Sequence, residues 1–250
     1  MRLRFERIQQ SGRNPLRAVA YLILITSACL FNSPVLSDQF LIPNYRESQE
    51  TFWAELYPKD GWTLYCGEFF ESRDNVTIEY IYPVANIAQM MNCSAVDECR
   101  ATNAQFNRME ADLHNMYPAL KYIVDAREDY RYGIINGEYR EFFECDFEQD
   151  VRDKVVEPRP IARGNIARAM LYMNTEYKLP LDAAALQMYK DWNLADPPSK
   201  DEMRRNDLIE RLQGTRNPYI DNPKLANSVH VKIAESPSKR EIDRQIIESF

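Results

Sequence analysis

The sequence predicts a single α+β domain, in which a few short strands come first and helices fill the C-terminal half. Short runs rich in β-branched and aromatic residues, at 63–66, 76–82 and 139–147, are typical of strands. After residue 160 the apolar residues recur at helical spacing, with prolines and a glycine between the runs. Strands followed by helices, rather than alternating with them, indicate an α+β fold. At 250 residues the chain has length for one sizeable core and a leader.

The N-terminal half contains two expected helices and the last expected strand. Residues 44–56 form the first helix, because their aromatic and leucine side chains make an apolar stripe. Residues 103–116 form the second helix, which places His114 and Asn115 near its end. In the strand at 139–147, aromatic and cysteine side chains alternate on one face.

The C-terminal half is punctuated by helix-breaking residues. Pro180, a proline pair at 197–198 and Gly214 separate three expected helices, at 161–177, 183–192 and 200–212. The chain from residue 222 onward is polar, and its end at 240–250 forms either a small amphipathic helix or a frayed terminus.

The N-terminus has the layout of a secretory signal. Five arginines lie in the first 17 residues, an apolar to weakly polar run follows at 18–31, and residues 35–37 offer a cleavage site. The run is short for a membrane span, so we expect no stable membrane anchoring after cleavage. An uncleaved anchor is the alternative, and a lipoprotein site at Cys29 is disfavoured by Thr26. The expected organisation is a signal peptide at 1–37, a domain at 38–221 and a polar tail at 222–250.

Export makes disulfides the expected state of the remaining cysteines. Cys66, Cys93, Cys99 and Cys145 lie beyond the leader. Four cysteines in an exported domain predict two disulfides, for which sequence allows three connectivities. A Cys93–Cys99 pair would close a short loop, and four free buried thiols are the alternative if export fails.

The charge balance bears on which partners the protein can bind. The whole chain carries −7; five of its 31 basic and one of its 38 acidic residues lie in the leader, which leaves −11 on the remainder. Proteins that grip duplex DNA usually present a basic face, so this balance disfavours tight, sequence-blind binding without excluding a local basic groove. The sequence has no glycine-rich phosphate loop, serine nucleophile elbow or Cys/His zinc spacing.

Five segments in order along the chain resemble motifs of the bacterial endonuclease I family. They are LYCG at 64–67, TIEYIYP at 77–83, MEADLHNMYP at 109–118, ARGNIAR at 162–168 and QGTRNPY at 213–219. The resemblance spans roughly residues 52–221 and implies an exported DNA-cutting enzyme with a disulfide-stabilised ββα-metal core. The family arrangement also implies a Cys66–Cys145 disulfide.

The resemblance assigns roles to four residues of the core. Glu79 and Asn115 would be ligands of Mg²⁺ or another divalent cation, which hard oxygen donors suit. Tyr80 stands where the family has its catalytic histidine, and Arg127 would stabilise charge on the phosphate. A structural reading of the first pair is a strand glutamate and an asparagine that caps a helix end. Arg127 could equally be a solvated helix arginine.

The sequence departs from the family pattern near these positions. A family arginine before the first motif falls near Asn75, and two family asparagines after the second motif fall on Val124 and Asp129. Arg163 and Arg168, at the expected start of a helix, are candidate phosphate-binding residues. Salt bridges to neighbours such as Glu157 are the alternative role for these two arginines.

These features predict an exported, periplasmic or secreted, metal-dependent endonuclease that hydrolyses DNA without sequence specificity. Tyrosine has an ordinary pKa near 10 and is a poor general base at neutral pH, so activity is expected to be weak. The alternative is an inactive pseudonuclease that serves as a binding or structural module, with a basic protein as its partner. A third reading is a nuclease that acts on RNA or short oligonucleotides.

Overall fold

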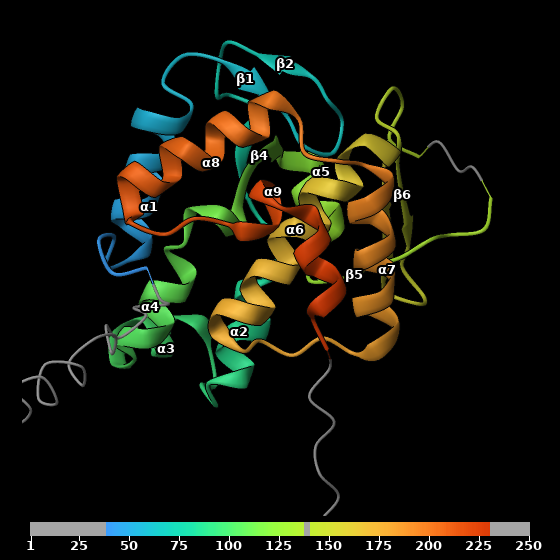
Figure 1. Ribbon diagram of the computed structural model, residues 1–250. Helices are drawn as coiled ribbons and strands as arrows, with labels where there is room; N and C mark the ends of the chain where they lie inside the picture. Colours follow the sequence, from blue (N-terminus) through green and yellow to red (C-terminus); the bar gives the residue numbers. More distant parts are fainter. Residues whose placement is uncertain (1–38, 138–140, 231–250) are drawn as a thin grey trace, which may run out of the picture. The chain divides into compact units, whose positions relative to one another are not determined.

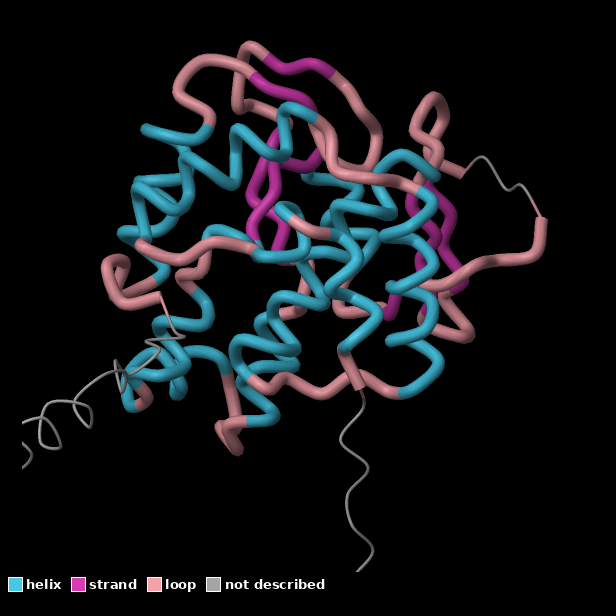
Figure 2. The backbone as a smooth tube through the Cα atoms, in the orientation of Figure 1, coloured by secondary structure: helices cyan, strands magenta, loops and turns pink. Residues whose placement is uncertain are grey.

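The computed structural model describes residues 39–137 and 141–230, and Figure 1 shows the order and arrangement of their elements. The predicted signal peptide at 1–37 and the possible helix at 240–250 lie outside the described residues. Short strands occupy the first two thirds of the described chain, and helices dominate after Pro158 (Figure 2). The α+β class predicted from the sequence is therefore confirmed.

A ββα unit lies at the centre of the domain. Strand β3 (Val76–Tyr80) pairs antiparallel with β4 (Met116–Leu120), in a register that sets Glu79 opposite Tyr117. Helix α5 (Lys121–Arg127) follows β4 directly and packs on both strands. This unit confirms the strand expected at 76–82, and the TIEYIYP segment runs through the end of β3.

The segment between β3 and β4 is helical, but not in the way that was expected. It holds α2 (Val84–Met90), α3 (Val96–Thr102), α4 (Ala104–Glu110) and the 3₁₀ turn η3 (Leu113–Asn115). The prediction of one helix over 103–116 is therefore wrong in its second half. Asp112 takes an extended backbone and accepts a hydrogen bond from His114 N at 2.8 Å, which ends the helix and starts the 3₁₀ turn.

The helix predicted at 44–56 is confirmed. It consists of α1 (Tyr45–Thr51), which continues into the π-helical turn η2 (Phe52–Leu56). Asn44 begins it, because its side-chain oxygen accepts hydrogen bonds from the backbone amides of residues 46 and 47.

The strand predicted at 63–66 is wrong, because these residues form the turn of a hairpin. Strands β1 (Gly61–Trp62) and β2 (Phe69–Phe70) pair on either side of it. Gly67 donates to Thr63 O at 2.9 Å with φ +66, a conformation that glycine adopts at little cost.

A three-stranded sheet has the order β5–β7–β6, formed by β5 (Arg131–Tyr132), β7 (Val155–Pro158) and β6 (Phe147–Asp150). The strand expected at 139–147 is wrong over its described part. Residues 141–145 form turns, and Phe143 is exposed with φ +56, so the alternation of apolar residues there does not reflect a buried strand face.

The three C-terminal helices are confirmed as α6 (Pro160–Tyr177), α7 (Ala183–Ala195) and α8 (Lys200–Gln213), followed by α9 (Pro218–Asp221) and the 3₁₀ helix η4 (Pro223–Ser228). The folded domain extends beyond residue 221, where the polar tail was expected to begin. Asn193 Nδ2 donates to Pro223 O at 2.8 Å, and Ala226 and Val229 are buried in the core. The tail prediction is corrected accordingly for residues 222–229.

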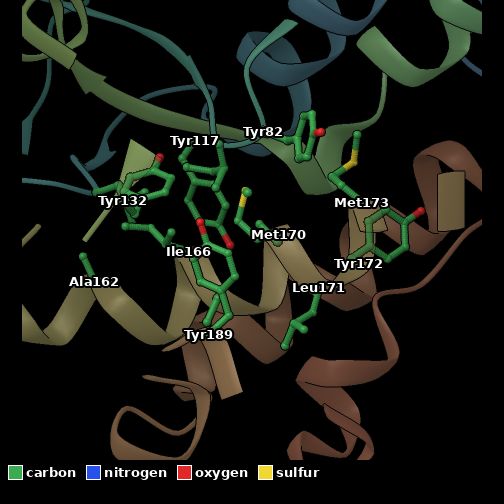
Figure 3. Close-up of a cluster of buried hydrophobic side chains, with 14 of the residues drawn as sticks. Tyr82, Tyr117, Tyr132, Ala162, Ile166, Met170, Leu171, Tyr172, Met173 and Tyr189 are labelled. Atoms are coloured by element: carbon green, nitrogen blue, oxygen red, sulfur yellow. The ribbon is translucent and has the colours of Figure 1, made fainter. Parts of the chain in front are cut away.

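Helix α6 runs through the main apolar core. Figure 3 shows Ile166, Met170 and Leu171 of this helix close to tyrosines that come from the strands and from α7. The helix is buried around most of its circumference, which explains why its side chains show little amphipathic pattern.

Two disulfides tie the N-terminal half together. Cys66, in the hairpin turn, bonds to Cys145 before β6, and Cys93 bonds to Cys99 between α2 and α3. The connectivity implied by the family resemblance is thus confirmed.

Replacing Cys66 and Cys145 with alanine is expected to lower the free energy of unfolding more than replacing Cys93 and Cys99. The first bond closes a 79-residue separation and the second only six. Loop-closure entropy then gives upper bounds of about 4.5 and about 2 kcal/mol. Urea denaturation of both double variants measures this difference. A larger loss from the Cys93–Cys99 pair would contradict the entropic explanation.

Candidate active site

The carboxylate of Glu79 is enclosed by partners from its own chain. Glu79 is 2% exposed, and Oε1 accepts a hydrogen bond from Tyr65 OH at 2.8 Å. Arg127 Nη1 lies 3.0 Å from the same oxygen. Tyr65 OH also shares a hydrogen bond of 2.6 Å with Tyr132 OH. Burial raises the pKa of Glu79, while the nearby guanidinium and the Tyr65 hydrogen bond oppose that rise.

Arg127 connects the end of α5 to the end of β3. Its Nη1 donates to Tyr80 O at 3.2 Å and Nη2 donates to Ile81 O at 2.7 Å. The guanidinium also lies over the Tyr132 ring at 4.8 Å from its centroid. Arg127 is therefore a buried partner of Glu79, rather than the solvated helix arginine that the sequence left open.

A small concavity opens beside this arginine. It has a volume of about 220 Å³, and its walls include Tyr82, Tyr132 and Tyr189. Arg127 Nε is buried there without a hydrogen-bond acceptor. The arrangement brings Arg127, a second arginine at 131 and several tyrosines to one site, which two aspartates also line.

Asn115 has both ends of its amide engaged. It is fully buried, Oδ1 accepts from Tyr82 N at 2.7 Å, and Nδ2 donates to Tyr82 O at 3.0 Å. Ile81 N donates to the Asn115 backbone oxygen at 2.9 Å. The side chain thus holds the segment that follows β3, a role that needs both an amide donor and an amide acceptor. Asn115 is the last residue of η3, as the helix-end alternative expected, but its amide bonds the backbone of Tyr82 rather than that of its own helix end.

Tyr80 faces away from Glu79. Successive residues of a strand point to opposite sides. Tyr80 packs against a second apolar cluster that contains Phe52, Ile78 and Met116. Burial raises the pKa of its phenol above the ordinary value, and the carboxylate of Glu110 adds to the shift. Tyr80 therefore holds its proton at neutral pH and is unsuited to be a general base.

The two predicted metal ligands, Glu79 and Asn115, are each partly engaged by groups of the protein itself. Their donor types suit Mg²⁺, but Mg²⁺ requires free oxygen lone pairs and room for several waters. Oε1 of Glu79 and Oδ1 of Asn115 belong to buried side chains, and each already accepts a hydrogen bond from a protein group. Among residues 39–137 and 141–230, moreover, no group of three His, Cys, Asp or Glu side chains could hold a metal.

The predicted phosphate-binding arginines are paired with carboxylates. Arg168 is fully buried, and its Nε and Nη2 each donate to Glu202 at 2.6 Å. This corrects the prediction that Arg168 contacts substrate, because no phosphate can reach it. Arg163 is half-buried and donates to Glu157 Oε1 at 2.6 Å, so the salt-bridge alternative describes it.

Sequence reasoning missed the partners that enclose Glu79. Tyr65 lies within the LYCG segment, where only the cysteine was given a role, and Tyr132 has no local signal. It also missed Asp112, whose carboxylate accepts hydrogen bonds from Tyr172 OH at 2.8 Å and Tyr177 OH at 2.5 Å. These contacts span 60 residues or more, which no spacing rule reaches.

The ββα unit of β3, β4 and α5 carries a glutamate near the end of its first strand, within an α+β domain that has two disulfides. Residues 45–224 match the family model described as Endonuclease I, and the chain belongs to that family. No helix in the described part of the chain is long and apolar enough to cross a membrane.

Three curated relatives illustrate the similarity. An extracellular deoxyribonuclease of Aeromonas hydrophila is 27% identical over 80% of this chain and 96% of its own length. A periplasmic deoxyribonuclease of the same organism is 33% identical over 57% of this chain and 62% of its own length. Endonuclease-1 of Buchnera aphidicola subsp. Acyrthosiphon pisum is 35% identical over 46% of each chain.

Proposed function

We propose that this protein is an exported nuclease of the endonuclease I family that acts on DNA with a low rate of hydrolysis. Family membership over residues 45–224 supports the nuclease class, and the names of the relatives support DNA and export. Two disulfides agree with an oxidising compartment outside the cytosol. The buried, protonated phenol of Tyr80 is the observation that carries the low rate.

The family generally depends on a divalent metal, and Glu79 is the carboxylate that would bind it. In the present arrangement Arg127 and Tyr65 occupy that carboxylate. Arg127 lines the concavity and contacts Glu79, and stabilisation of charge on a substrate phosphate is its proposed role.

Replacing Tyr80 with histidine is expected to raise the rate of DNA cleavage, because an imidazole has its pKa near neutral pH. The gain should not exceed about 10²-fold, the low end for a general base, because position 80 faces the apolar cluster of Phe52 and Met116 rather than Glu79. Glu79→Ala is expected to be inactive. Tyr80→Phe is the matched control: it keeps the ring but removes the hydroxyl, and it should cleave as slowly as the wild type. The measurement is plasmid nicking by the purified oxidised protein with Mg²⁺, repeated with RNA.

Fast cleavage by the wild type, together with a loss of rate in Tyr80→Phe, would contradict this account of Tyr80. If neither the wild type nor any variant cleaves DNA or RNA, the enzymatic proposal fails. The second candidate function, an inactive pseudonuclease that binds a partner, then takes its place. The closure of Glu79 by Tyr65 and Arg127 and the charge of −11 after residue 37 favour that candidate, and the charge suits a basic protein partner.

A further inference from the structure

We propose that a cleft between the β1–β2 hairpin and helix α8 binds a single-stranded segment of nucleic acid. The inference rests on the proposed function in that it assumes a nucleic-acid ligand. The cleft, called here the hairpin–α8 cleft, has a volume of about 660 Å³, and its walls include Tyr57, Trp62, Tyr117, Arg159, Arg204 and Arg205. Figure 1 shows β1 and β2 next to α8, and the starts of α6 and α8 close the cleft.

Two of its arginines have no carboxylate partner within the described residues. Arg159 Nε donates to Leu64 O at 3.0 Å, and this side chain forms no ion pair within 4 Å among the described residues, although Asp146 and Asp196 act on it electrostatically. Its guanidinium lies against Gly67, where an added Cβ would come 1.9 Å from Nη1. The hairpin turn thus accepts glycine alone at the point where it supports this charge.

Arg205 is the second arginine without an ion pair among the described residues, although Glu202 acts on it electrostatically. Its guanidinium lies 4.2 Å from the centroid of the Tyr117 ring and donates to the backbone oxygens of Leu113 and Met116. Its Nε and Nη1 are buried without a well-formed hydrogen bond, although the Tyr57 hydroxyl lies beside the guanidinium. A buried cation whose donors are only partly satisfied is an electrostatic reason for an anion to enter the cleft.

The acidic residues of the cleft are largely neutralised. Glu202 is bound by Arg168, and Asp201 forms an ion pair with Arg204, whose side chain is 68% exposed. Asp60 is the remaining carboxylate among the lining residues. Among the described lining residues, two arginines and one aspartate therefore form no ion pair, so the cleft offers cationic groups within an acidic protein.

An exposed aromatic pair lies at the rim. Trp62 is 62% exposed and Phe69 is 48% exposed, with their ring centroids 5.2 Å apart. Aromatic platforms beside cationic grooves bind unpaired bases by stacking, whatever the base. A duplex keeps its bases stacked and offers none to Trp62, and the charge of −11 after residue 37 disfavours a sequence-blind grip on duplex phosphates. The combination therefore favours a single strand over a duplex.

The cleft adjoins the candidate active site. Tyr117, in its floor, is the strand partner of Glu79, and Leu64 N donates to Pro118 O at 2.8 Å. A strand held in the cleft would therefore lie next to the β3–β4 pair.

The test measures binding of a fluorescein-labelled ten-nucleotide oligo(dT) to the oxidised mature protein by fluorescence anisotropy, in EDTA so that no cleavage occurs. Trp62→Ala is expected to weaken binding about 5- to 150-fold, the range for loss of one stacked base. Arg204→Glu is expected to weaken binding. It should also reduce the slope of log K against log salt concentration by about 0.7, the value for one phosphate of a single strand. Asp201→Asn, which frees Arg204 from its ion pair, is expected to tighten the binding of oligo(dT).

Matched controls lie away from the cleft. Arg152 is 85% exposed and pairs with the neighbouring Asp153, as Arg204 pairs with Asp201, so Arg152→Glu makes the same change of charge elsewhere. Phe143→Ala removes an exposed aromatic side chain that does not line the cleft. Neither control should change the affinity for oligo(dT).

The proposal is overturned if Trp62→Ala and Arg204→Glu bind oligo(dT) as the wild type does, if the controls lose as much affinity, or if a duplex of equal length binds more tightly. Plasmid nicking separates this result from a failure of the proposed function. If the wild type cleaves DNA and the cleft variants bind oligo(dT) as it does, the cleft proposal fails and the proposed nuclease function stands. If oligo(dT) binds at the cleft but neither the wild type nor any Tyr80 variant cleaves nucleic acid, the nuclease proposal fails and the cleft proposal stands.

Discussion

Replacing Arg168 with methionine is expected to lower the free energy of unfolding by about 3–5 kcal/mol, because it leaves a buried carboxylate without its partner. Arg168 and Glu202 have side chains that are 1% exposed, and they form two hydrogen bonds of 2.6 Å. Arg168 Nη1 also donates to Asp196 O at 2.7 Å, so the same side chain holds the loop between α7 and α8. Urea denaturation at neutral pH measures the loss.

The double variant Arg168→Met/Glu202→Leu separates the pair from its surroundings. Removing both charges is often neutral when the replacements pack well, so it should recover most of the stability lost in the single variant. Arg152→Met, which breaks an exposed pair with Asp153, should change stability by less than about 1 kcal/mol. A stable Arg168→Met protein with weaker DNA binding would instead restore the role that the sequence predicted for this arginine.

The ARGNIAR segment shows why such a motif is hard to interpret from sequence. Arginines at the start of a helix are a reasonable phosphate site. In the structure Gly164 allows a close approach, since an added Cβ would lie 2.0 Å from Asp196 O and 2.8 Å from Arg168 Nη1. The partner Glu202 lies 34 residues further along the chain. Because α6 is buried around most of its surface, a charge at this position must be paired inside the protein.

The long helices were predictable because each one has its own local signals. Asp182 and Ser199 accept hydrogen bonds from backbone amides at the starts of α7 and α8, and Gly214 ends α8 in the left-handed conformation. The short strands were harder. At 63–66 the hairpin turn outweighs the β-propensity of the side chains, and at 116–120 a strand follows a 3₁₀ turn where helical spacing indicated a helix.

The candidate site, too, was predictable from the sequence only in part. Motif matching found Glu79, Tyr80 and Asn115 in the ββα unit, because these residues lie close together in the sequence of each motif. It could not predict that neighbouring residues on β3 face different clusters, or that Tyr65 and Arg127 enclose the carboxylate. Those facts depend on contacts between distant segments, and they decide whether the site can bind a metal or transfer a proton.

Acid is expected to destabilise the protein through His114. Burial lowers the pKa of His114 to about 4; the Asp112 carboxylate opposes this shift, and the Arg205 and Arg216 guanidinium groups add to it. Its Nε2 contacts Thr215 O at 3.1 Å, and Nδ1 is buried without a partner, so the neutral ring that donates from Nε2 suits the site. In the unfolded chain the pKa is ordinary, near 6.5.

Between pH 6.5 and 4 the unfolded chain therefore binds a proton at this residue that the folded protein does not. The contribution of His114 to the free energy of unfolding is complete above pH 6.5 and falls as the pH decreases, by about 3 kcal/mol at pH 4. His114→Gln removes the titration, so the stability difference between wild type and variant should shift by that amount from pH 7 to pH 4. His230→Gln, at an exposed histidine, is the control and should leave the pH profile unchanged. A His114→Gln profile parallel to that of the wild type would show that the imidazole is accessible to protons in the folded state.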